Sequence, residues 1–219
     1  MLQHVDRLIV TTDYLANKFS HVHSDIKVIN NMLPKELWEN PLLTKPTTQK
    51  TSVKIRVGWA GAAQHHHDLA WLKTVIEATH KQVQWVFYGY IPNNINTDFI
   101  EFHDHTPLGI YHSTLAKLQL DIAIAPLVNN PFNKAKSNLK LLEYGALALP
   151  TICSDIENYK NSPAIKLDNN PQEWIDTVLD LANNANQRKK LATDMLYWVK
   201  DNYFLEDNLN LWIDSLYIP

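Results

Sequence analysis

The sequence contains a single cysteine, Cys153, among its 219 residues. One cysteine excludes an internal disulfide framework and a cysteine-rich zinc site. Cys153 lies in the apolar segment 151–154. We therefore predict a buried and unreactive thiol at this position rather than a nucleophile.

The sequence also lacks long apolar runs and a strongly basic charge. No stretch approaches the roughly 20 apolar residues that cross a bilayer, and residues 1–7 lack the charged-then-apolar plan of a signal peptide. These features favour a soluble, cytoplasmic protein. The formal net charge of −3 provides no basic field for nucleic acid, so nucleic acid is not an expected partner.

What the sequence does contain is an alternation of strand-like and helix-like segments. Helical spacing is clearest in 68–80, where Leu69, Leu72, Val75 and Ile76 fall on one face. Strands that alternate with helices through right-handed crossovers predict a doubly wound, Rossmann-like α/β domain, in which a parallel sheet has helices on both faces. The predicted strands are 4–12, 26–29, 53–59, 84–88, 100–103, 121–127, 151–154 and 164–167. The predicted helices are 13–19, 68–80, 111–120, 138–147, one opened by Pro171, and 187–202.

The chain divides into four parts. Residues 1–30 hold too little strand and helix to form a core of their own, so we interpret them as the closing piece of a preceding domain. Residues 31–51 form a polar, proline-bearing linker, residues 52–195 form the Rossmann-like domain, and residues 196–219 form a helical tail. We expect a C-terminal portion of a larger two-domain protein.

The most informative segment is 131–155, which follows the apolar strand 121–127. It is predicted to form a loop, a short helix, a turn and a strand. A helix N-terminus at the carboxyl end of a parallel strand binds phosphate through its amides. Lys136, Lys140 and Glu143 are spaced i, i+4 and i+7, so we predict that one helical face carries all three, with Ser137 as the N-cap. The lysines would meet phosphate, and the glutamate would accept hydrogen bonds from sugar hydroxyls.

Three segments of the chain carry a family resemblance. Residues 137–155 are similar to the donor-binding motif of retaining, nucleotide-sugar-dependent glycosyltransferases with the GT-B fold (group 1 type), which reads Lys-Ser-x-x-Lys-x-x-Glu-Tyr, a Gly/Ala turn, Pro, and a strand ending in Ser-Asp. Residues 57–69 resemble the first strand and loop of that family's C-terminal domain, in the form Gly-x-x-Gly-x-x-x-His-x-x-Asp-Leu. Residues 5–34 resemble the end of its N-terminal domain and the interdomain linker.

The resemblance implies a nucleotide-sugar site. It assigns Glu143 to the ribose hydroxyls, and Lys136 and Glu143 together to catalysis. Lys140 and the amides of Ser137 and Asn138 would face phosphate. The remaining residues that it assigns to the nucleotide-sugar are Gly58, Gly61, His65, Gly89 and Asn133.

It further implies that no metal or other cofactor is needed, because lysines and helix amides stabilise the diphosphate leaving group.

Two positions depart from the family pattern. Ala135 stands where many relatives carry an acidic residue that contacts the donor sugar, so Asn133 or Lys136 would take that role. Ala148 stands in place of a glycine near the end of the motif helix, and Gly145 is expected to supply the turn.

Several of these residues also have structural interpretations. Lys140 and Glu143 could form a surface i, i+3 pair, and Gly58 and Gly61 could serve as turn glycines. The run 65–67 contains three histidines, but adjacent residues do not face one way and no partner cluster is evident, so no zinc site is expected. The glycine loop lacks the full dinucleotide fingerprint, which argues against NAD. The segment 103–105 is interpreted as structural, with a place near the base as the alternative.

Three functions remain open. The leading hypothesis is the donor domain of a glycosyltransferase of hexosyltransferase type, which acts on a polysaccharide or glycoconjugate in bacteria and is inactive as this chain alone. Its partners would be a UDP- or GDP-sugar and, through the missing N-terminal domain, a glycan or lipid-linked acceptor. Peripheral association of the full-length protein with the inner face of the membrane is a further option. A GT-B-like epimerase and a non-catalytic interaction module are the alternatives.

Overall fold

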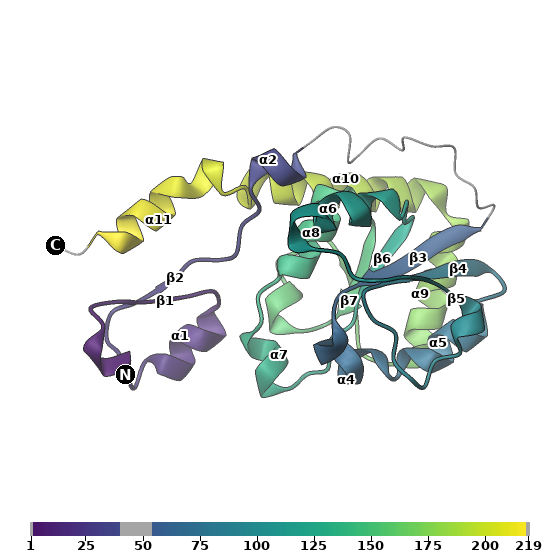
Figure 1. Ribbon diagram of the computed structural model, residues 1–219, viewed down its shortest axis with the longest axis horizontal. Helices are drawn as coiled ribbons and strands as arrows, with labels where there is room; N and C mark the ends of the chain where they lie inside the picture. Colours follow the sequence, from purple (N-terminus) through teal and green to yellow (C-terminus); the bar gives the residue numbers. More distant parts are fainter. Residues whose placement is uncertain (1, 40–53, 218–219) are drawn as a thin grey trace.

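The computed structural model describes residues 2–39 and 54–217 and has a parallel six-stranded sheet at its centre (Figure 1). The strand order is β5-β4-β3-β6-β7-β8, and every pair is parallel. The doubly wound α/β fold is therefore confirmed. The strands are β3 (Ile55–Ala60), β4 (Val83–Tyr88), β5 (Ile100–His103), β6 (Ile122–Ala125), β7 (Thr151–Ser154) and β8 (Ile165–Leu167).

The strand order reverses between β3 and β6. From β3 the chain adds β4 and β5 on one side, and it then returns to place β6 against the other side of β3. The loops after β3 and β6 consequently leave the sheet side by side. In open α/β sheets such a switch point is where ligands bind, outside the carboxyl ends of the strands.

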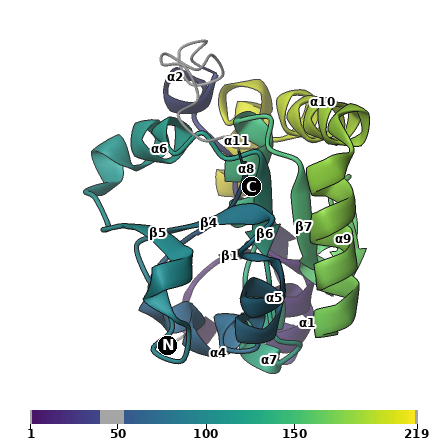
Figure 2. The same cartoon turned by 90° about the vertical axis from the view of Figure 1, so that its right-hand side faces the viewer.

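Helices cover both faces of the sheet (Figure 2). On one face α5 and α9 bury apolar side chains such as Leu72 and Trp174 against the sheet, and on the other face α6, α8 and α10 do the same with Leu115, Leu142 and Met195. The helices of this part are α4 (His66–Leu69), α5 (Leu72–Thr79), α6 (Leu108–Lys117), α7 (Pro131–Ala135), α8 (Leu139–Ala146), α9 (Pro171–Asn183) and α10 (Ala185–Asn202). Short 3-10 turns are η2 (Ala63–His65), η3 (Thr97–Phe99) and η4 (Glu157–Tyr159).

The strands β6 and β7 are buried along their whole length, because helices cover the sheet on both sides. Cys153 lies in β7 with none of its surface exposed, and burial raises the pKa of its thiol to about 12. The prediction of a buried thiol is confirmed.

One predicted helix is divided in two, and one predicted loop is a helix. The predicted helix 68–80 is two helices, α4 and α5, which are interrupted between Leu69 and Leu72. The segment 131–135, predicted as a loop, is the helix α7, in which the Asn130 side chain caps the N-terminus and Pro131 occupies the first turn.

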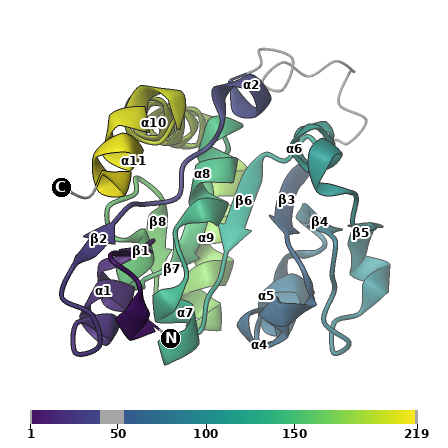
Figure 3. The same cartoon turned by 60° about the vertical axis from the view of Figure 1, so that its left-hand side comes forward.

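The N-terminal residues form a separate unit (Figure 3). It comprises η1 (Leu2–His4), β1 (Leu8–Val10), α1 (Asp13–Phe19) and β2 (Ile26–Val28), and β1 pairs with β2 in a two-stranded parallel sheet. Thr12 caps α1, because its hydroxyl accepts from the Leu15 amide. A two-stranded sheet is marginal alone, and here Arg7 ties the unit to the C-terminal helix by donating to the carbonyls of Ser215 and Tyr217.

The connector and the tail also contact each other. Leu33 forms a parallel bridge with Phe204, followed by α2 (Lys35–Trp38), while residues 40–51 of the predicted linker lie outside the described residues. After α10 come η5 (Glu206–Asn208) and α11 (Leu209–Leu216). The predicted boundary between residues 195 and 196 was wrong, because α10 runs through it without a break. Among the described residues no helix is both long and apolar enough to cross a bilayer.

The prediction that Gly145 supplies the turn after α8 was wrong. Gly145 lies inside the helix, where an added Cβ would come within 2.6 Å of Val199 Cγ2 and 2.9 Å of the Met195 carbonyl oxygen. Its role is close packing against α10 and not a turn. The turn is made by Ala148, which has a φ of 54° in the left-handed region and donates to Gly145, while Leu149 donates to Tyr144. This is a Schellman motif with alanine where glycine is preferred.

Replacing Ala148 by glycine should stabilise the protein. The left-handed conformation costs an L-residue roughly 1–2 kcal/mol, partly offset by the greater unfolded-state entropy of glycine. We expect Ala148→Gly to raise the free energy of unfolding by about 0.5–1 kcal/mol in urea denaturation. Ala192→Gly, inside α10, is the matched control and should lose about 1 kcal/mol. Equal losses in both variants would contradict the strain at Ala148.

Candidate nucleotide-sugar site

A cavity of about 520 Å³ opens at the carboxyl ends of β3, β4 and β5, beside the switch point. Its volume is within the range of small-molecule sites. Four segments supply the walls: the loop after β3, the end of β4, the β5–α6 loop with the start of α6, and residues 136–143; Tyr159 completes them. The lining residues are Gly61, Ala62, Gln64, His65, Tyr88, Gly89, His105, Thr106, Leu108, Tyr111, Lys136, Ser137, Leu139, Lys140, Glu143 and Tyr159.

Lys140 reaches the cavity wall from the first turn of α8. Its Nζ donates to the carbonyl oxygen of Ala60, at the end of β3, and lies over the ring of Trp59 at 5.0 Å. Burial lowers the pKa of Lys140, although the nearby carboxylate of Glu143 acts in the opposite direction. The position excludes a solvated surface pair with Glu143, because this ammonium lies against the interior of the site.

Glu143 lies one helical turn further along α8 and also lines the cavity. Its Oε2 accepts a hydrogen bond of 3.0 Å from the Tyr111 hydroxyl. Burial raises the pKa of this carboxyl more strongly than Lys140 and Tyr111 lower it. Tyr111 is stacked on Tyr88, with ring centroids 5.5 Å apart, so α6 and β4 together fix the hydroxyl that orients Glu143.

Lys136 lies outside the helix, contrary to the prediction of one helical face. It caps the C-terminus of α7 in an extended conformation, so the i, i+4, i+7 spacing does not apply to it. It nevertheless shares the cavity with Lys140 and Glu143. Its Nζ lies 3.6 Å from Asp68 Oδ2 and 4.9 Å from the Phe132 ring centroid. In the described part of the chain this buried nitrogen makes no hydrogen bond, and burial lowers the pKa of Lys136 although Asp68 acts in the opposite direction.

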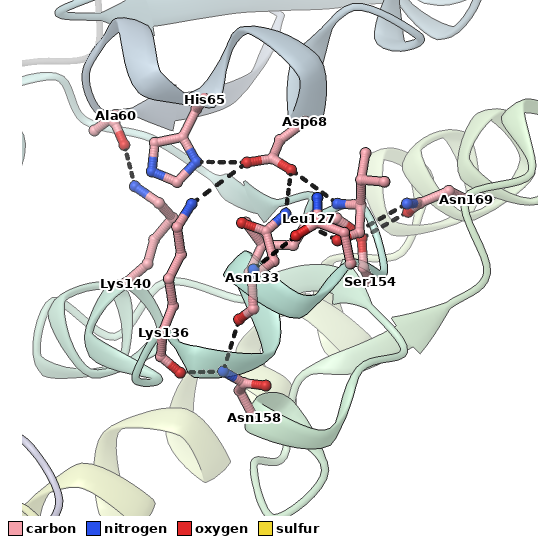
Figure 4. Close-up of polar contacts among 12 residues, drawn as sticks. Ala60, His65, Asp68, Leu127, Asn133, Lys136, Lys140, Ser154, Asn158 and Asn169 are labelled. Atoms are coloured by element: carbon pink, nitrogen blue, oxygen red, sulfur yellow. Dashed lines mark hydrogen bonds and ion pairs between the residues drawn. The ribbon is translucent and has the colours of Figure 1, made fainter. Parts of the chain in front are cut away.

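The carboxylate of Asp68 is the centre of a polar network beside the cavity (Figure 4). Its Oδ2 accepts from His65 Nδ1 at 2.9 Å, and its Oδ1 accepts from the Val128 amide at 2.8 Å and from Asn133 Nδ2 at 2.6 Å. Burial acts to raise the pKa of Asp68, but these hydrogen bonds together with Lys136 outweigh it, so the pKa lies below its ordinary value. Asp68 therefore joins the loop after β3 to the loop after β6.

The glycines divide into two groups. Gly61 and Gly89 line the cavity and contact each other: Gly89 has a φ of 92°, and a Cβ there would overlap the carbonyl oxygen of Gly61. Gly58, which the resemblance assigned to the nucleotide-sugar, lies within β3 and outside the cavity lining, and a Cβ there would overlap Leu120. Gly58 is thus a packing residue of the sheet.

Of three asparagine and serine residues that were predicted to bind the nucleotide-sugar, one lines the cavity and two do not. Ser137 lines the cavity and accepts a hydrogen bond of 2.8 Å from Asn31 Nδ2, but the N-cap of α8 is Asn138, not Ser137. Neither Asn138 nor Asn133 lines the cavity. The Asn133 side chain is buried in the Asp68 network, with its second donor bond to the Val128 carbonyl.

The prediction missed Asp68 and Tyr111 as site residues. Asp68 could have been found from its i, i+3 spacing to His65, but Tyr111 carries no signal in the sequence because the fold alone brings α6 to α8. In the segment 103–105, His103 pairs with Glu101 at 2.6 Å, which is a structural role, whereas His105 lines the cavity. Among the residues described, no group of three or more His, Cys, Asp or Glu side chains is arranged to hold a metal ion.

The fold is similar to that of several solved structures. No family model matches the sequence, and no curated protein matches it at the sequence level. Solved structures do match. TarM has a TM-score of 0.69 at 14% identity over 96% of this chain. WaaG, a glycosyltransferase involved in lipopolysaccharide biosynthesis, has a TM-score of 0.64 at 10% identity over 94% of it. Anabaena HepE in complex with UDP and glucose has a TM-score of 0.69 at 12% identity over 97% of it.

This chain spans 43% of TarM, 62% of WaaG and 63% of HepE. The chain therefore has the fold of the C-terminal part of a GT-B glycosyltransferase. At these identities the likeness establishes the fold, and the individual site assignments stay predictions.

The raised pKa of the buried Glu143 carboxyl predicts how the folding stability depends on pH. Its pKa is raised above the unfolded value of 4.5, so its favourable contribution is present below that value and is lost as the pH rises through the folded pKa. Glu143→Gln keeps the shape and the acceptor for Tyr111 but does not titrate. We expect it to be more stable than wild type by about 1 kcal/mol at alkaline pH, with the difference shrinking toward acid pH.

Thermal denaturation of both proteins across that pH range measures this difference. Glu173→Gln, on the exposed surface of α9, is the control and should follow wild type at every pH. A Glu143→Gln variant that is less stable than wild type at alkaline pH would contradict the assignment.

Proposed function

We propose that this chain is the donor-binding domain of a glycosyltransferase that takes a sugar from a nucleoside diphosphate sugar. The observation that carries the proposal is the convergence of Lys136, Lys140 and Glu143 on one cavity at the sheet's switch point. Two ammonium groups and one carboxylate in a partly enclosed site suit a ligand with an anionic centre and hydroxyl groups at its side.

The two lysines would hold the diphosphate. Both are partly desolvated. Lys136 Nζ has a long ion pair of 3.6 Å with Asp68 and makes no hydrogen bond among the described residues, so a phosphate oxygen would supply one. During transfer the bond from the sugar carbon to phosphate oxygen breaks and negative charge builds up on the departing diphosphate. Cations that are already in place stabilise that charge without further reorganisation.

Glu143 would bind the ribose. Its carboxylate faces the cavity and is already oriented by the Tyr111 hydroxyl, so its remaining lone pairs can accept from the two ribose hydroxyls. Gly61 and Gly89 permit a close approach of backbone to ligand on the opposite wall.

The acceptor would bind outside this chain. The chain spans less than two thirds of the matched glycosyltransferases, so we infer that a further domain supplies the acceptor site and that this chain alone turns over little. The HepE and S. aureus TarM structures that carry UDP favour a uridine nucleotide here. A hexosyl group, retention at the sugar carbon, and a bacterial glycoconjugate as product, made in the cytoplasm or at the inner face of the membrane, are parts of the same proposal.

The composition of the cavity favours a transferase over an epimerase. An epimerase of this fold needs acid and base groups on both sides of the sugar. Among the described lining residues, Glu143 is the one carboxylate, and it sits on the wall that we assign to ribose. A non-catalytic module would need no nucleotide at all.

Calorimetric titration with UDP, GDP and TDP tests the proposal. We expect at least one diphosphate to bind to wild type, and Lys136→Ala to weaken it about 10- to 100-fold while changing the affinity for the corresponding nucleoside less than about 2-fold. Glu143→Gln should weaken diphosphate and nucleoside alike, by about 10-fold.

Lys134→Ala is the matched control, because Lys134 lies on α7 outside the cavity lining and its substitution removes the same charge. It should leave both affinities unchanged. If none of the three diphosphates binds, or if Lys136→Ala weakens nucleoside and diphosphate equally, the proposed phosphate site is refuted.

A further inference from the structure

His65 and Asp68 form a hydrogen-bonded pair beside the cavity. His65 Nδ1 lies 2.9 Å from Asp68 Oδ2, and the other two bonds to the carboxylate come from Val128, on the loop after β6, and from Asn133, on α7. Because both partners of Oδ1 are fixed donors, the carboxylate cannot rotate freely. It therefore holds the proton of the neutral imidazole on Nδ1.

This tautomer leaves Nε2 as the reactive atom of the ring. His65 lines the cavity, and Figure 4 shows its second nitrogen turned away from Asp68, on the side of the Lys140 amine. The edge of the Trp59 ring fixes the imidazole from β3, with ring centroids 5.7 Å apart. Without ligand, Nε2 is an unprotonated acceptor that faces a cavity with two lysines.

The charges around His65 oppose its protonation while the cavity is empty. Burial lowers its pKa most, the hydrogen bond to Asp68 acts against this, and the ammonium groups of Lys140 and Lys136 lower the pKa further. Five other titratable groups line the same cavity: Glu143 from α8, His105 from the β5–α6 loop, Tyr88 from β4, Tyr111 from α6 and Tyr159 from η4. The imidazole is thus neutral at neutral pH.

A diphosphate reverses this balance. Its negative charges neutralise Lys136 and Lys140 and place an acceptor oxygen within reach of Nε2, so that a proton from solvent can bind there and bridge to phosphate. The imidazolium that results is held by Asp68 on one side and by phosphate on the other.

We propose that Asp68 is a positioning residue that presents His65 Nε2 to the donor diphosphate, and that the pair takes up one proton when the nucleotide-sugar binds. This inference rests on the proposed function, since it needs a diphosphate in the cavity. It adds a third cation to the site, which forms only in the complex, and makes donor affinity decrease as the pH rises.

Titration calorimetry in two buffers of different ionisation enthalpy measures the proton directly. The probes are UDP-glucose, GDP-glucose and TDP-glucose, because a diphosphate diester has no group of its own that titrates near neutral pH. At about pH 7 we expect the wild-type complex to take up about 0.5–1 proton. The affinity should fall by up to about 10-fold per pH unit between the pKa of His65 in the free protein and its higher pKa in the complex, and it should level off above the latter.

Two variants locate the proton. His65→Gln and Asp68→Asn should bind the same nucleotide-sugar more weakly, by about 10-fold, with no proton uptake and a flat pH dependence. His66→Gln is the matched control, because His66 contacts Tyr90 and does not line the cavity; it should keep both the affinity and the uptake of wild type. Should Asp68→Asn fail to fold, His65→Gln decides the question alone.

The outcomes separate the two proposals. Binding without proton uptake by wild type, or uptake that survives His65→Gln, overturns this inference and leaves the proposed function intact, with Nε2 then accepting from a sugar hydroxyl. If wild type binds none of the three nucleotide-sugars, the proposed function fails and this inference fails with it.

Discussion

The hydrogen bonds of the Asp68 carboxylate hold together the two loops that leave the sheet at its switch point. The sheet brings β3 and β6 side by side, but it does not dictate how the chain continues beyond them. Burying an ionised carboxylate is costly unless its oxygens are satisfied. Here His65, the Val128 amide and Asn133 satisfy them, and Lys136 lies nearby. Placing one carboxylate therefore fixes the walls on both sides of the site.

The charged groups at the cavity are desolvated before any ligand binds. Asp68 and Glu143 face Lys136 and Lys140, but burial lowers the pKa of both lysines and raises that of Glu143, so each group is held away from its preferred hydration. Charged groups that are desolvated before the ligand binds are typical of binding sites, where a lower folding stability accompanies a higher affinity for the ligand. The alanine in the left-handed turn after α8 is a different case, since Ala148 does not line the cavity.

The fold followed from the sequence more closely than the site did. Buried parallel strands are short apolar runs, so 151–154 was predicted with correct bounds; the bounds of the edge strand 100–103 were also correct, although none of its residues is buried. The helix α7 was missed because its five residues carry no periodicity. Lys136 was assigned to a helix because spacing alone cannot reveal that the chain becomes extended between α7 and α8. Tyr111 was missed because its partner is 32 residues away in sequence.

One contact links the cavity to the N-terminal unit. The Asn31 side chain, on the connector that follows β2, donates to the Ser137 hydroxyl, which lines the cavity. The same connector is fixed two residues later by the bridge from Leu33 to Phe204, beyond the end of α10, and α10 packs on α8, which carries Lys140 and Glu143. The connector thus contacts both the start of the 136–143 segment and the tail that follows α10. The bond from Asn31 to Ser137 therefore anchors the connector at the cavity, three residues after the end of β2.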